Sequence, residues 1–152
     1  MTTREHIERI TDEGLFERLC ISIIRNRKPE LSGILETGTN AQGRTIPAPL
    51  DGFVQVDKDN FVSIHHTTIG KSKLKSKWLG KGEDLEKTAE EMSGLREKFP
   101  SGKFEIILTT THVPNVKLQK EVIEKADEFG LIVEFLDQSS IADFLDNNPS
   151  GQ

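Results

Sequence analysis

The chain has 152 residues, of which 34% are hydrophobic and 30% charged, and its formal net charge is −5. This length fits one domain, and no apolar run approaches the roughly 20 residues that a membrane-spanning helix needs. The single cysteine, Cys20, excludes an internal disulfide framework and a four-cysteine zinc site. Together with the lack of a basic-then-apolar leader, it makes us expect a protein of the reducing cytoplasm.

Two helices are predicted at the start of the chain. Thr2 and Glu5 have the spacing of a capping box, which predicts a short helix over about 3–10. A stronger helix is predicted over about 12–27, because apolar residues recur there at helical spacing, namely Phe16, Leu19, Cys20, Ile23 and Ile24. Pro29 ends this helix, since the residue before a proline avoids the helical conformation.

The next part of the chain predicts an antiparallel meander of three strands. A short strand is expected over 34–37, followed by a glycine-rich loop over 38–43. Two further strands, over 50–56 and 61–68, are separated by the turn-forming residues 57–60. Neighbouring strands joined by so short a turn pair antiparallel.

The second half of the chain alternates helices with strands. We expect helices over 71–79, 83–98, 116–129 and 139–145, and strands over 104–109 and 131–136. Strands that alternate with helices pair parallel and have helices on both faces. The prediction is therefore an α/β fold with a central mixed sheet, forming one domain over 1–146, with 147–152 as a polar tail or linker.

A basic stretch interrupts this acidic chain. Five lysines and no acid lie between positions 71 and 81, namely Lys71, Lys73, Lys75, Lys77 and Lys81. Such a run is most often a solvated helix face, but a local basic surface on an acidic protein also meets phosphates. The sole tryptophan, Trp78, lies within this stretch and is expected to anchor the core.

Several polar residues are candidates for one site. Asp51 begins the 50–56 strand, and His65 and Thr67 lie near the end of the next strand. Because side chains alternate along a strand, His65 and Thr67 share one face, and a hairpin sets Asp51 beside them. Glu17, at the edge of the apolar stripe of its helix, is a fourth candidate. Taken singly, each also fits a plain structural role in a turn, in packing or on a solvated face.

These residues resemble the motifs of a known superfamily. The quoted segments are Phe16-Glu17-Arg18-Leu19, Leu50-Asp51-Gly52-Phe53, His65-His66-Thr67 and Lys77-Trp78-Leu79. In this order they resemble the PD-(D/E)xK, or restriction-endonuclease-like, superfamily, and the region from Gly38 to Phe53 is similar to Mrr-like nuclease domains. The tail from Leu145 to Gln152 resembles the point where such a domain passes into a signalling NTPase of prokaryotic antiphage defence.

The resemblance implies a metal-dependent endonuclease that hydrolyses DNA. Asp51 matches the central metal ligand, Glu17 the helical acid of some members, and His65 the first residue of the triplet, so these three would hold Mg²⁺ or Mn²⁺. Thr67 stands where the catalytic lysine is usual. A lysine from a neighbouring element would replace it, and Lys71 and Lys73 are the nearest in sequence, with Lys71 the one assigned to the site. Histidine in place of an acid shifts the preference from Mg²⁺ toward borderline metals such as Mn²⁺ or Zn²⁺.

The same resemblance gives the basic residues a role. Phosphate contacts are expected from the loop before Asp51 and from the basic stretch, namely Arg44, Thr45, Lys73, Lys75, Lys77 and Lys81. Two other functions remain open: a degenerate nuclease fold that only binds nucleic acid, and a structural or oligomerisation domain. The expected partners are DNA, further domains of the same polypeptide and a second copy of the chain, with no membrane.

Overall fold

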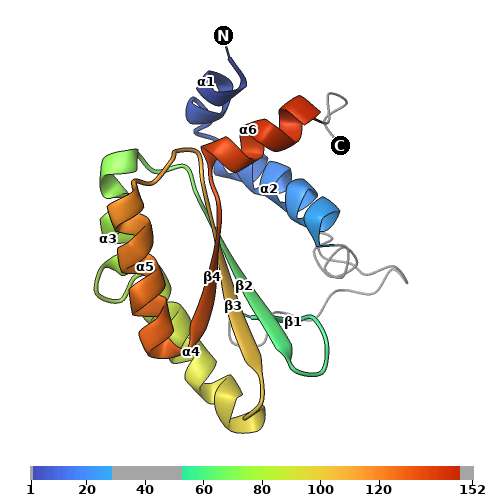
Figure 1. Cartoon of the computed structure of the whole chain (residues 1–152), viewed down its shortest axis with the longest axis vertical. Coiled ribbons are helices and arrows are strands. Elements are labelled where there is room, and N and C mark those ends of the chain that lie inside the picture. Colours follow the sequence, from blue (N-terminus) through green and yellow to red (C-terminus); the bar gives the residue numbers. More distant parts are fainter. Residues whose placement is uncertain (1, 29–52, 148–152) are drawn as a thin grey trace.

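The computed structural model describes residues 2–28 and 53–147 (Figure 1). It opens with helix α1 (Thr3–Glu8), whose capping box between Thr2 and Glu5 is formed as predicted. Helix α2 (Glu13–Arg27) follows, and the side chain of Asp12 accepts a hydrogen bond from the Leu15 amide at its start. Helix α1 ends at Glu8, two residues before the end that the sequence predicts.

Four strands form the mixed sheet. They are β1 (Val54–Gln55), β2 (Asn60–Thr67), β3 (Lys103–Thr110) and β4 (Leu131–Leu136), in the order β1-β2-β3-β4. The β1–β2 pair is antiparallel, and the β2–β3 and β3–β4 pairs are parallel. The predicted α/β class with a mixed sheet is confirmed. The strand expected over 34–37 lies outside the described residues.

The turn between β1 and β2 forms as its residues predict. The Asp57 carboxylate accepts hydrogen bonds from the amides of Asp59 and Asn60 and from the Asn60 side chain. These bonds hold the pKa of the Asp57 carboxyl below its usual value. The turn places β2 beside β1, and it starts β2 at Asn60, one residue earlier than expected.

The helices of the second half connect the parallel strands. A 3-10 turn (Lys71–Lys73) leads into α3 (Leu74–Leu79), and α4 (Asp84–Lys98) follows. Helix α5 (Val116–Phe129) lies between β3 and β4, and α6 (Gln138–Asn147) ends the described chain. Gly130, at φ +82°, ends α5 in the left-handed conformation, as its position predicts.

Helices cover both faces of the sheet, and each face has its own core (Figure 1). On one face α3, α4 and α5 bury Trp78, which is fully enclosed as expected, with Phe61 and Phe104 stacked at 5.0 Å. On the other face α2 and α6 bury Phe16, Cys20 and neighbouring aliphatic residues. Among the described residues, no helix has the length and apolarity needed to cross a membrane.

Candidate functional site

His65 lies near the end of β2 and points toward α4. Its Nε2 atom is 3.0 Å from both Ser63 Oγ and Thr88 Oγ1, and its Nδ1 atom is 3.7 Å from Asp84 Oδ1. When Nδ1 carries the ring proton, the single lone pair of Nε2 accepts a hydrogen bond from one hydroxyl or the other. Burial lowers the pKa of His65, with Asp84 opposing the shift. The ring therefore joins β2 to α4 as a neutral group.

Asp84 is the centre of this polar cluster. It begins α4, is only 6% exposed, and its Oδ1 atom lies 3.4 Å from Lys77 Nζ of α3. Its Oδ2 atom is buried and has no hydrogen-bond partner. Sequence reasoning missed Asp84, because an acid in the first turn of a helix is ordinary dipole compensation. Lys77, not Lys71, is the lysine that the structure brings to His65 through Asp84.

The cluster contains the residue types of a hydroxyl nucleophile, a base and an acid, but a substrate cannot reach its hydroxyl groups. Ser63 is 2% exposed and Thr88 is fully buried. A nucleophile must reach the electrophilic atom of a substrate, and neither hydroxyl does. Thr67, two residues along the strand, is also buried, and its Oγ1 accepts a hydrogen bond from the Ile69 amide at 3.1 Å. The hydroxyl groups of Ser63, Thr67 and Thr88 therefore make contacts within the fold.

His66 faces the opposite side of the sheet. Its Nδ1 atom is 2.9 Å from Thr109 Oγ1, and the Phe16 ring of α2 meets it edge-on at 6.5 Å between centroids. Burial lowers the pKa of His66 to about 4. The adjacent histidines of the predicted triplet thus belong to two different cores.

The structure does not bring Glu17 and His65 together. Glu17 is an exposed residue of α2, and α2 packs on the sheet face that carries His66, whereas His65 points to α4 on the other face. Asp51, Arg44 and Thr45 lie outside the described residues. Within residues 2–28 and 53–147, no group of three His, Cys, Asp or Glu side chains is placed to hold a metal ion.

The five lysines of the basic stretch have different surroundings. Lys75 Nζ is 3.4 Å from Glu121, Lys77 pairs with Asp84, and the charge of Lys81 contributes to the lowered pKa of Glu86. Lys71 and Lys73 are exposed and form no ion pair with another described residue. Within the described residues, Lys71 and Lys73 are thus the lysines of this stretch with neither an ion pair nor an electrostatic effect on the pKa of an acid.

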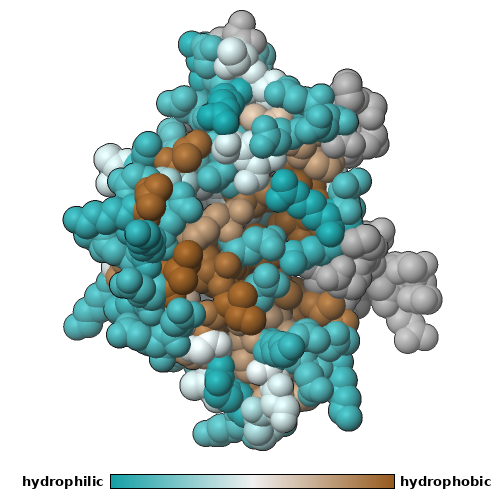
Figure 2. Space-filling view, viewed as in Figure 1, coloured by the Kyte–Doolittle hydropathy of each residue, from teal (hydrophilic) through white to brown (hydrophobic). Residues whose placement is uncertain are grey.

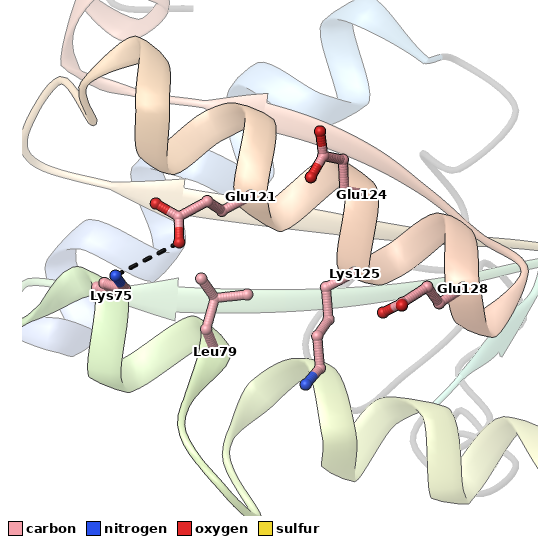
Figure 3. A pocket seen from close by; sticks show the side chains of 6 residues that line it. All are labelled: Lys75, Leu79, Glu121, Glu124, Lys125 and Glu128. Carbon is pink, nitrogen blue, oxygen red and sulfur yellow. Dashed lines mark ion pairs between the residues drawn. The ribbon is translucent and has the colours of Figure 1, made fainter.

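Lys75 lies in a groove between α3 and α5, where acidic side chains surround it (Figure 3). The groove has a volume of about 450 Å³ and is lined by Lys75, Leu79, Glu121, Glu124, Lys125 and Glu128. Lys125 also pairs with Glu86 at 3.5 Å. Three carboxylates against two ammonium groups make this groove unfavourable for a phosphate backbone.

Comparison with known proteins identifies no relative of this chain. No protein family, curated protein or solved structure matches the chain. The resemblance to the nuclease superfamily therefore rests on the sequence segments and is a proposal.

Proposed function

We propose that this chain is a DNA-binding domain of the restriction-endonuclease-like type in which the triplet has become structural. The observation that carries the proposal is the position of Lys71 and Lys73. Both are exposed just beyond the end of β2, and neither is paired with another described residue. Unpaired ammonium groups bind phosphates and release condensed counterions, which is the main source of sequence-independent affinity for DNA.

The described residues do not fit the metal centre that the superfamily implies. Glu17 and His65 lie on opposite faces of the sheet, and the nitrogens of His65 contact Ser63, Thr88 and Asp84. Thr67 uses its hydroxyl within its own turn. We therefore derive no hydrolytic step from these residues, and the binding function is preferred to cleavage.

The wider setting is part of the same proposal. The domain would act in the cytoplasm, where the free thiol of Cys20 stays reduced, as the DNA-binding part of a larger prokaryotic defence protein. Arg44 and Thr45, in the glycine-rich stretch before Asp51, would add phosphate contacts. Further domains of that polypeptide would supply the response to binding.

The test is binding of a short fluorescent DNA duplex, followed by anisotropy at low and moderate salt. The variant Lys71→Gln/Lys73→Gln should bind at least about tenfold more weakly than the wild type at low salt. The matched control Lys98→Gln/Lys117→Gln removes two exposed lysines elsewhere and should change affinity little. Equal losses in the two variants, or no binding by the wild type, would refute the proposal.

A second function, metal-dependent endonuclease, is favoured by one observation. Asp84 has a buried oxygen without a partner next to the Lys77 ammonium, so an acid and a lysine do adjoin the altered triplet. Carboxylate oxygens suit Mg²⁺ and Mn²⁺. Nicking of supercoiled plasmid with Mg²⁺ or Mn²⁺, blocked by EDTA and by Asp51→Ala, would establish this function. Intact plasmid in every condition, with binding retained, would favour the binding domain.

A further inference from the structure

Strand β4 forms an open edge of the sheet. In the part of the chain that the structure describes, β4 pairs with β3 on one side and with no strand on the other. Within residues 2–28 and 53–147, the outer row of its amides and carbonyls thus has no partner strand, as at the edge of a sheet. The sequence of β4, Leu-Ile-Val-Glu-Phe-Leu, holds one charge and no proline, so little in it discourages such pairing.

Apolar side chains flank this edge. Ile132 of β4 is 55% exposed, and on α5 Ile123 is 44% and Val116 67% exposed. Figure 2 shows apolar residues gathered near the middle of this face, over β4 and beside α5. Ile132 alternates with Leu131 and Val133, which pack under α5, so it lies on the other face of β4 from the α5 residues. Exposed apolar side chains on both faces beside a strand edge are typical of a protein interface.

One face of α5 carries a self-complementary pattern. Val116, Lys120, Ile123 and Asp127 follow one another at helical spacing and are all exposed. This face lies away from the groove that Glu121, Lys125 and Glu128 form with α3. Lys120 and Asp127 are opposite charges on either side of Ile123. An antiparallel copy of the same helix would place each lysine against an aspartate.

The helix and the strand share one possible symmetry axis. Ile123 lies seven residues before Gly130, which at the helical rise of 1.5 Å is about 10 Å along the sheet. Val133 lies three residues after Gly130, which at the strand rise of about 3.3 Å is also about 10 Å. A two-fold axis midway between two β4 strands, at the level of Val133, therefore lies at the same height as Ile123.

We propose that two copies of this chain form a dimer through β4 and α5. The β4 strands pair antiparallel about Val133 and join the two sheets, and the α5 helices pack antiparallel beside them. Ile123 meets Ile123 of the second copy, and Lys120 meets Asp127 in two symmetric ion pairs. Such an isologous contact uses the same surface twice and closes on itself. This inference does not depend on DNA binding.

The test is sedimentation equilibrium of the full chain, with variants that alter the charge pattern. Lys120→Glu and Asp127→Lys each create two like-charge contacts and should raise the dimer dissociation constant at least about tenfold. The double variant Lys120→Glu/Asp127→Lys restores opposite charges and should recover most of the affinity. The control Lys117→Glu makes the same charge change on α5 outside the Val116–Asp127 face and should have little effect.

Each outcome decides the proposal. A wild-type chain that stays monomeric up to about 100 μM would overturn it, since even a weak specific interface shows at that concentration. A dimer that Lys120→Glu does not weaken, or that the double variant does not restore, would place the interface elsewhere. Circular dichroism of every variant separates loss of association from loss of folding.

Discussion

His65 and His66 are neighbours in the chain, yet they lie in different cores on opposite faces of the sheet. His65 contacts Asp84 and Thr88 of α4, and His66 contacts Thr109 and the ring of Phe16. The alternation of side chains along β2 produces this division. It commits both rings to packing between sheet and helices, and each ring is largely withdrawn from water.

The first prediction concerns stability at acid pH. The pKa of His66 is lowered to about 4 in the folded protein, below about 6.5 in the unfolded chain. The unfolded state therefore takes up a proton first as the pH falls. The contribution of neutral His66 to the free energy of unfolding is complete above pH 6.5 and is lost as the pH falls from 6.5 to 4. The upper limit of this loss is roughly 3 kcal/mol.

The measurement is urea unfolding at several pH values across this window. His66→Asn keeps a polar atom near Thr109. It should reduce the slope of unfolding free energy against pH by the amount that corresponds to uptake of about one proton on unfolding. His6→Asn, at an exposed position of α1, is the control and should leave the slope unchanged. Identical slopes for all three proteins would show that His66 is not buried as described.

The second prediction compares two lysines of α3. Lys77→Gln leaves the Asp84 carboxylate buried without a cation, and the free energy of unfolding should fall by about 1–2 kcal/mol. Lys75→Gln removes an ion pair whose lysine side chain is 65% exposed, and should cost less than about 0.5 kcal/mol. Equal effects in chemical denaturation would contradict the burial of Asp84.

The third prediction concerns the end of α5. Gly130 has φ +82°, and a Cβ atom there would come within 2.8 Å of the Arg96 guanidinium. Gly130→Ala should therefore lower the free energy of unfolding by about 1 kcal/mol or more. Gly70→Ala is the control, because that position has ordinary geometry and nothing within 4 Å. A Gly130→Ala protein as stable as the wild type would contradict this helix end.

The fourth prediction concerns the single thiol. Burial raises the pKa of Cys20 to about 12, and the side chain is fully enclosed between α2 and the sheet. A thiol-specific alkylating reagent at pH 8 should leave the folded protein unmodified and label it rapidly in denaturant, because the thiolate is the reactive form. Fast labelling without denaturant would show that α2 does not cover this face.

The elements were predictable from the sequence because each one has a local cause. Thr2 and Glu5 fixed the start of α1, Asp57 and Asn60 fixed the turn before β2, and Gly130 ended α5. Periodicity also gave the buried face of α2. These signals act over a few residues and depend little on the rest of the fold.

The candidate site was less predictable because its contacts join distant residues. Asp84 meets His65 only because the turn after β2 and helix α3 return the chain to the same sheet face, and no local pattern encodes that path. The predicted meeting of Glu17 with His65 required knowing which face of the sheet α2 covers. Alternation says which residues share a face, not which helix lies over it.

The central claim is that Lys71 and Lys73 contact DNA phosphates, and the salt dependence of binding tests it most directly. The measurement is the slope of log affinity against log salt for a DNA duplex, with wild type and Lys71→Gln/Lys73→Gln. If each lysine neutralises one phosphate, the slope of the double variant should be smaller by about 1.8. A wild-type chain that binds no duplex at low salt, or two proteins with equal slopes, would contradict the account.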